Sequence, residues 1–232
     1  MTAPKLDVPP VVLSAPSGAG KTTMARALVE GEEDFSFSVS ATTRAPRAGE
    51  THGEDYLFLS RDDFREMARE GAFAEWAEVH GELYGTPLSS LAAASGGKRH
   101  VVLDIDVQGA AQIREAVPQA LLLFILPPSV EILFRRLRDR GTEGEEAIRR
   151  RLNTALEELK AAESFDFFVV NDNLERAIRE VRDLVRWSTS GEGAGLQEPS
   201  TSGSMKHVRQ LREGIQALLG RENLLESSQE ND

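Results

Sequence analysis

Short apolar runs alternate with longer amphipathic stretches along most of the chain. The buried strands that these runs predict lie at 11–14, 101–106, 120–126 and 167–170. The helices expected between and after them lie at 21–29, 108–116, 130–140, 142–164 and 174–187. Because strands that are apolar throughout are covered on both faces, this order predicts an α/β fold with a parallel β-sheet flanked by helices.

Two polar residues suggest where the later helices begin. Ser129 precedes the helix expected at 130–140 and suits an N-cap, since its hydroxyl can accept a backbone N–H of the first turn. Thr142 and Glu145 have the spacing of a capping box that would open the helix ending near Ser164.

The stretch 35–88 has a different pattern. Polar and apolar residues alternate at 35–40 and 56–59, one short helix is expected at 62–70, and glycines mark turns between them. We expect a small mixed α+β subdomain at about 35–90, inserted into the α/β core.

The last part of the chain changes in character again. Residues 188–204 are rich in Ser, Gly, Thr, Glu and Pro, which predicts a flexible linker. Helical spacing then relates the apolar residues Val208, Leu211, Ile215, Leu218 and Leu225, so an amphipathic helix from about 205 is expected, with a disordered tail at 226–232. The junction at 203–205 is compatible with a foreign peptide joined there. The helix has three open roles: packing on the core, pairing with a copy of itself, or docking a partner.

Composition excludes several classes of protein. The 232 residues include no cysteine, which excludes disulfide frameworks, zinc–thiolate sites and thiol nucleophiles. The formal net charge of −11 disfavours nonspecific binding to nucleic acid or anionic lipid. No apolar run approaches the roughly 20 residues that span a bilayer, and the first ten residues lack the core of a signal peptide. We therefore expect a cytoplasmic protein that binds neither nucleic acid nor membrane.

The segment between the first strand and the first helix matches a phosphate-binding loop. Its glycines let backbone N–H groups converge on phosphate oxygens at a helix N-terminus. Lys21 suits the β- and γ-phosphates, and the Thr22 hydroxyl suits Mg²⁺ carried by ATP. Ala15 replaces the usual first glycine, which restricts the backbone there. The predicted ATP-binding residues of this segment are Ala15, Pro16, Ser17, Gly18, Ala19, Gly20, Lys21, Thr22 and Thr23.

The phosphoryl acceptor must be identified from other residues. Arg44 and Arg47 are three positions apart with Pro46 between them, and two guanidinium groups suit a phosphate dianion. Tyr56 and Tyr84 could add hydroxyl donors. Taken alone, the two arginines are equally compatible with an ordinary surface loop.

The segment 38–50 resembles the acceptor-binding subdomain of the guanylate kinases, a family of P-loop nucleoside monophosphate kinases, here of the bacterial type. The further segments that carry this resemblance lie at 53–56, 73–77, 84–86, 103–109, 127–129, 140–142 and 169–172. They follow one another in order from about Pro10 to Trp187, so we expect one domain of this type at 1–187, and the resemblance leaves 188–232 unassigned. It implies a GMP-binding subdomain at about 35–90 and a lid at about 136–151.

The resemblance implies transfer of the γ-phosphoryl group of ATP to GMP, with Mg²⁺ bound through ATP. It assigns the GMP phosphate to Ser40, Arg44, Arg47, Tyr56 and Tyr84, guanine to Glu75 and Thr86, the acceptor side to Asp106, and the surroundings of Mg²⁺ to Asp104. It also places Asn171 near adenine. The catalytic residues that it implies are Lys21, Arg44, Asp104, Arg136, Arg140 and Arg151. Asp104 and Asp106, two apart at the end of a predicted strand, would share one side of it.

Two alternatives remain open. A noncatalytic guanylate-kinase-like module that binds phosphopeptides would typically have a degraded phosphate loop, whereas Gly20, Lys21 and Thr22 are intact here. A small-molecule kinase with another phosphorylated acceptor, such as a sugar phosphate, would not need the combined set of Glu75, Tyr84 and Thr86. The oligomeric state is not readable from the sequence, and a partner contact through the C-terminal helix stays open.

Overall fold

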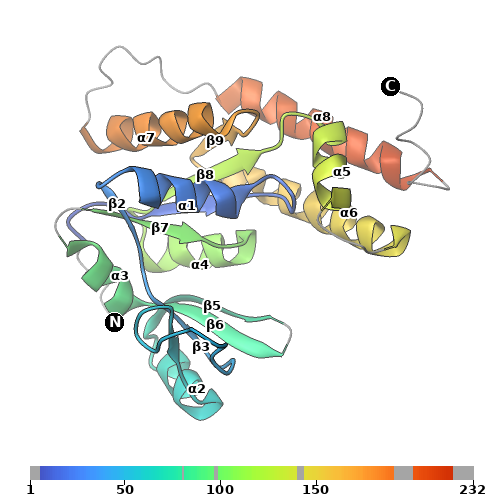
Figure 1. Ribbon diagram of the computed structural model, residues 1–232. Helices are drawn as coiled ribbons and strands as arrows, with labels where there is room; N and C mark the ends of the chain where they lie inside the picture. The colour runs from blue at the N-terminus through green and yellow to red at the C-terminus, as the bar shows by residue number, and fades with distance from the viewer. Residues whose placement is uncertain (1–5, 80, 97–98, 140–143, 191–200, 222–232) are drawn as a thin grey trace. The chain divides into compact units, whose positions relative to one another are not determined.

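A computed structural model gives the fold and describes residues 6–79, 81–96, 99–139, 144–190 and 201–221 (Figure 1). The strands are β1 (Val11–Ser14), β2 (Phe35–Phe37), β3 (Ser40–Thr42), β4 (Tyr56–Phe58), β5 (Phe73–Val79), β6 (Glu82–Pro87), β7 (His100–Asp104), β8 (Leu121–Leu126) and β9 (Phe167–Val170). The helices are α1 (Lys21–Gly31), α2 (Arg61–Arg69), α3 (Leu88–Ala94), α4 (Val107–Ala116), α5 (Val130–Asp139), α6 (Glu145–Lys160), the short 3₁₀ helix η2 (Ala161–Ser164), α7 (Leu174–Ser190) and α8 (Thr201–Leu219).

Two sheets organise these elements. One has five strands in the order β2-β7-β1-β8-β9, and the other has four in the order β4-β3-β6-β5. The pairs β1–β7, β2–β7 and β8–β9 are all parallel. Val11, Val12 and Leu13 of β1 are fully buried, as are the last four residues of β8. The prediction of a parallel sheet flanked by helices is confirmed.

The chain divides into two compact units. The first contains the described residues up to Leu13 and those from Ala25 to Leu122, and the second contains Ser14–Met24 and the described residues from Leu123 onward. The division passes through β1 and β8. The four-stranded sheet therefore belongs to the first unit, and the phosphate loop belongs to the second.

Two predictions about strands were wrong. β7 ends at Asp104, and Asp106 is instead the N-cap of α4, where its carboxylate accepts the Gly109 N–H at 2.8 Å. Asp104 and Asp106 therefore do not lie in one strand and do not share a side of it. At the N-cap position, the Asp106 carboxylate instead accepts an N–H that the first turn of the helix leaves without a backbone partner. The segment Phe35–Phe37, expected in the inserted subdomain, instead pairs with β7 at the edge of the parallel sheet.

Of the two helix starts predicted from polar residues, one is confirmed. The Ser129 hydroxyl accepts the Ile132 N–H at 3.3 Å, which confirms the predicted cap of α5. The capping box was wrong, because α6 begins at Glu145 with Gly144 as its N-cap and without a side-chain cap. Thr142 lies outside the described residues. The final residues of the helix expected to reach Ser164 form η2 rather than α-helix.

The C-terminal helix packs within its own unit. α7 continues to Ser190 and α8 begins at Thr201, so both ends of the stretch expected as a linker are helical. Residues 191–200 and the expected tail at 226–232 lie outside the described residues. Val208, Leu211 and Ile215 of α8 are 2%, 1% and 0% exposed. These three residues lie on the buried side of α8, and α8 contacts α5, α6 and β9. Among the described residues, no helix is both long and apolar enough to cross a bilayer.

Candidate functional site

The phosphate loop of the second unit lies between Ser14 and Lys21 and depends on two glycines. Gly18 and Gly20 have φ of +90° and +92°, in the left-handed region that disfavours other residues. A Cβ on Gly20 would lie 2.5 Å from Asn171 Nδ2, and one on Gly18 would lie 2.9 Å from Leu137 Cδ2. Conformation and space therefore both require glycine at these two positions.

Two side chains hold the loop through one carbonyl. Asn171 Nδ2 donates to the Ala19 carbonyl at 2.8 Å, and Arg136 Nη1 donates to the same oxygen at 3.1 Å. Arg136 Nη2 donates in addition to the Asn171 carbonyl at 3.1 Å. The structure thus brings together three separate segments of the chain that were predicted to belong to the site: the phosphate loop, Arg136 and Asn171.

A pocket of about 400 Å³ opens beside this loop. Its lining consists of Gly18, Gly20, Thr23, Arg136, Asp139, Asn171, Asp172 and Leu174. Its size falls in the range of small-molecule sites. Asp139, Asp172 and Leu174 were not among the predicted site residues. Asp172 belongs to the segment 169–172, which carries the family resemblance, and this place in the segment was the sequence signal that could have identified it.

The remaining ATP-side residues lie around the loop. Ala15 is buried, whereas Thr22 and Thr23 are exposed in the first turn of α1. Arg151 Nη1 donates to the Leu137 carbonyl at 3.4 Å, which links α6 to α5. Arg140 lies outside the described residues.

Sequence reasoning missed a carboxylate at the loop. Glu158 Oε2 accepts the Ser17 N–H at 2.7 Å. Nothing in the sequence distinguished Glu158 from its neighbour Glu157, whose carboxylate faces solvent and pairs with Lys160.

Five of the residues predicted to bind GMP lie on one face of the four-stranded sheet. Ser40 pairs with Tyr56, Thr42 pairs with Tyr84, and Glu75 pairs with Thr86. Residues paired across a ladder share a face, and so do residues two apart in one strand. Ser40, Tyr56, Tyr84, Thr86 and Glu75 therefore lie on the same face, although they come from four different strands.

A β-bulge places Glu75 on that face. The register of β5 against β6 shifts between Phe73 and Glu75, so these two residues, two apart in sequence, point to opposite faces. Phe73 joins the apolar cluster of Ala41, Phe64 and Leu83 on the other face. Without the bulge, Glu75 would lie on the same face as this cluster.

Glu75 is a buried carboxylate with a specific partner. Glu75 is only 8% exposed, and Thr86 Oγ1 donates to Glu75 Oε1 at 2.6 Å. Burial raises the pKa of Glu75, and the negative charge of Asp106 raises it further, while the Thr86 hydrogen bond opposes the shift. A Cβ on Gly109 would lie 3.2 Å from Glu75 Oε2, so the first turn of α4 closely approaches the carboxylate.

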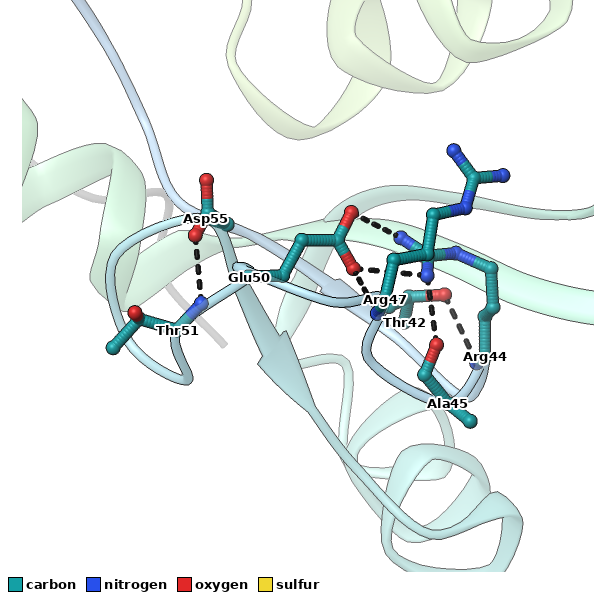
Figure 2. Close-up of polar contacts among 7 residues, drawn as sticks. All are labelled: Thr42, Arg44, Ala45, Arg47, Glu50, Thr51 and Asp55. Carbon is teal, nitrogen blue, oxygen red and sulfur yellow. Dashed lines mark hydrogen bonds and ion pairs between the residues drawn. The ribbon is translucent and has the colours of Figure 1, made fainter.

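Arg44 is held by Glu50 in the loop after β3. Figure 2 shows the pair: Nη1 donates to Oε2 at 3.0 Å and Nη2 donates to Oε1 at 2.9 Å. Glu50 also accepts the Arg47 backbone N–H at 2.7 Å. The hydrogen bond from Arg44 is the main cause that lowers the pKa of Glu50, and the same bond raises the pKa of Arg44. The sequence analysis had not identified Glu50.

The aromatic residues lie beside Arg44 rather than Arg47. The Arg44 Cζ atom is 5.5 Å from the centre of the Tyr56 ring, and the Tyr56 and Tyr84 rings are 6.3 Å apart. Arg47 is exposed, and Figure 2 shows its guanidinium group extending away from the Glu50 carboxylate. The structure therefore brings Arg44, Tyr56 and Tyr84 together and leaves the Arg47 side chain outside this cluster.

Comparison with known proteins covers both units. The family model for guanylate kinase matches residues 8–188. A guanylate kinase of Oleidesulfovibrio alaskensis is 55% identical over 172 residues, which are 74% of this chain and 84% of that protein. One of Rubrobacter xylanophilus is 48% identical over 181 residues, which are 78% and 95% of the two chains. The crystal structure of guanylate kinase from Anaplasma phagocytophilum superposes with a TM-score of 0.58 at 32% identity, covering 79% of this chain and 87% of that one.

Proposed function

This chain belongs to the guanylate kinase family, and from this premise we propose that it transfers the γ-phosphoryl group of ATP to GMP, giving ADP and GDP. The buried Glu75–Thr86 pair carries the proposal, because it presents a carboxylate and a hydroxyl together in a place where water is scarce. The intact phosphate loop with Gly18 and Gly20 supplies the donor side.

On the donor side, backbone N–H groups of the phosphate loop, such as those of Gly18 and Gly20, would bind the ATP phosphates at the N-terminus of α1. Lys21 would neutralise the β- and γ-phosphates, and Thr23 would border the nucleotide. Asn171 and Arg136 would hold the loop in this shape, since both already bond the Ala19 carbonyl.

Mg²⁺ fits the donor side only together with ATP. Among the described residues, no group of three or more histidines or carboxylates could hold a metal ion by itself. The exposed Thr22 hydroxyl in the first turn of α1 suits one ligand position, and phosphate oxygens complete such sites in proteins. When bound, the ion neutralises charge on the phosphates. Asp104, at the end of β7, is the carboxylate we assign to its surroundings.

On the acceptor side, Arg44 would bind the GMP phosphate together with hydroxyl groups of Ser40, Tyr56 and Tyr84. These residues share one face of one sheet, and Arg44 lies over the Tyr56 ring. Arg47 would join them by rotation of its exposed side chain. A guanidinium group and hydroxyl donors match the oxygens of a phosphate dianion.

Guanine would be recognised through its hydrogen-bonding edge. Its N1–H and N2–H₂ groups donate side by side, so the ionised Glu75 carboxylate can accept both. The Thr86 hydroxyl, which has a single proton to donate, can satisfy O6 once it releases Glu75 Oε1. Asp106 would complete the acceptor side. Adenine presents a bare N1 lone pair at the same edge, which would face Glu75 without a proton between them. A buried mismatch of this kind costs on the order of a few kcal/mol.

The chemistry needs no general base, because the attacking GMP phosphate oxygen is already anionic near neutral pH. Catalysis would consist of positioning the two nucleotides and neutralising the charge that develops on the transferred group. Lys21, Arg44, Arg136 and Arg151 are the cations assigned to this task, together with Arg140, which lies outside the described residues. Exclusion of water would prevent hydrolysis of ATP.

The two alternatives lose support. A phosphopeptide-binding module has no use for the positive-φ glycines of the loop or for the 400 Å³ pocket beside it. A kinase with a different phosphorylated acceptor has no use for a buried Glu75 that bonds Thr86. A cytoplasmic location and binding of neither nucleic acid nor membrane stay predictions, and so does any partner contact of α8.

Lys21→Ala tests the donor side. We expect kcat for GDP formation to fall by at least about two orders of magnitude, because Lys21 is assigned to charge in the transition state. GMP affinity, measured by calorimetry without ATP, should change little. Lys160→Ala, which removes an exposed lysine of α6, is the matched control. A loss of less than threefold in kcat would refute the role of Lys21.

A further inference from the structure

The side chain of Gln112 in α4 bonds the backbone of β5 twice. Gln112 Oε1 accepts the Trp76 N–H at 3.1 Å, and Gln112 Nε2 donates to the Trp76 carbonyl at 3.0 Å. β5 is the edge strand of its sheet, so the outward N–H and C=O groups of Trp76 have no neighbouring strand. The Gln112 amide takes the place of that strand.

The same side of α4 also reaches Glu75. Asp106, Gly109 and Gln112 follow one another at intervals of three residues and therefore lie on one side of the helix. Asp106 caps the helix, and the Gly109 backbone approaches Glu75 Oε2. Glu75 is the residue next to Trp76, so the Gln112 amide fixes β5 at the point where Glu75 faces the start of α4.

We propose that Gln112 is a positioning residue for base recognition: by clamping Trp76, it sets the depth and direction of the Glu75 carboxylate relative to Thr86 and Asp106. This inference rests on the proposed function, since it assumes that Glu75 reads guanine. The ladder of β5 with β6 is regular from Glu75 onward but is interrupted between Phe73 and Glu75, so Glu75 stands directly beside the irregularity. The Gln112 amide holds the next residue, Trp76, at the edge of the strand that β6 does not cover.

The substitution Gln112→Leu tests the proposal, because leucine keeps the bulk and loses both hydrogen bonds. We expect the ratio of kcat/KM for GMP to that for AMP to fall by about tenfold or more, because a small displacement of a recognition group has large kinetic effects. The KM for ATP should stay unchanged. Gln108→Leu, at an exposed position of the same helix, is the matched control. Gln112→Glu keeps the acceptor for the Trp76 N–H and loses the donor, and it serves as the second variant if the leucine variant does not fold.

Glu75→Gln is measured in parallel so that the two assignments are tested separately. A lower GMP-to-AMP ratio in both variants supports the clamp. A lower ratio in Glu75→Gln but an unchanged ratio in Gln112→Leu, whatever its Tm, overturns the clamp and leaves the proposed function standing. An unchanged ratio in both overturns the assignment of Glu75 and the clamp with it.

Discussion

At the scale of single residues, Glu75 shows how burial and selectivity are connected. A carboxylate in a dry site is destabilised, and burial accordingly raises the pKa of Glu75. Guanine would return to it the two hydrogen bonds that water no longer supplies. A base that lacks these donors would leave the charge buried with no more than the Thr86 hydrogen bond, which is the physical origin of the expected discrimination.

Glu75→Gln should therefore erode the preference for GMP. The amide still accepts the Thr86 hydroxyl but accepts only one guanine donor well, and its own N–H₂ can donate to adenine N1. We expect the ratio of kcat/KM for GMP to that for AMP to fall by about 10²-fold, close to the loss of one charged hydrogen bond. Glu78→Gln, an exposed position of the same strand, should leave the ratio unchanged. An unaltered ratio in Glu75→Gln would contradict the base-reading role.

The raised pKa of Glu75 also predicts a dependence on pH. As pH falls from neutral through the raised pKa, which lies above the ordinary 4.5, the carboxyl takes up a proton and cannot accept both guanine donors. The KM for GMP should rise over this range more steeply in the unmodified protein than in Glu75→Gln. In Glu75→Gln, the change in KM with pH should reflect only the titration of the GMP phosphate, whose second pKa is about 6. Parallel curves for the two proteins would argue against a titrating Glu75 at the base.

Glu75→Gln, which should weaken GMP recognition, should by contrast stabilise the protein without nucleotide. Because the pKa of Glu75 is raised in the folded protein, its contribution to stability is complete below the unfolded value and is lost as pH rises through the folded value. At neutral pH and without nucleotide, Glu75→Gln should raise Tm, and the difference from the unmodified protein should vanish near pH 4. A Tm at neutral pH below that of the unmodified protein would contradict this sign.

At the scale of elements, the buried strands were the most predictable part of the fold. β1 and β9 have the predicted bounds. β9 is an uninterrupted apolar run between Asp166 and Asn171, and β1 is an apolar run that follows two prolines and ends at Ser14. The end of β7 was misplaced because a carboxylate such as Asp106 suits a strand end and a helix cap equally well in sequence. The bulge before Glu75 could not be predicted, since its only trace is an apolar Phe73 two residues before a buried acid.

Helix α8 was predictable as an amphipathic helix but not in its packing. Its close approach to α5 depends on Gly214, where a Cβ would lie 2.5 Å from Val130 Cγ2. In the sequence this glycine is only a weak helix former, and nothing there identifies the helix that it contacts.

Gly214→Ala tests this packing. Alanine in a helix interior ordinarily stabilises by about 0.5–1 kcal/mol relative to glycine. Here the clash with Val130 should reverse the sign and destabilise by about 1–3 kcal/mol, which lowers Tm by about 2 °C or more. Gly203→Ala, in the same helix with no atom near its Cβ, should leave Tm unchanged or slightly raised. If both variants gain stability, α8 does not pack on α5 as described.

At the scale of the whole molecule, the two substrates are assigned to different units of the chain. The loop residues with Arg136 and Asn171 belong to one unit, and Arg44 with Glu75 belongs to the other. The sequence assigns residues to each substrate because each segment carries a family motif, and these assignments stay predictions. It did not predict Glu50 or Gln112, because their roles are contacts to a partner side chain and a partner backbone that no motif records.

The most direct test of the account measures ADP release from ATP and Mg²⁺ with GMP, AMP, CMP, UMP or no acceptor in parallel reactions. We expect rapid release with GMP, and release with each other nucleotide should be close to that of the reaction without acceptor. Release with GMP no faster than without acceptor would contradict the proposed function, and equal release with GMP and AMP would contradict the role of Glu75.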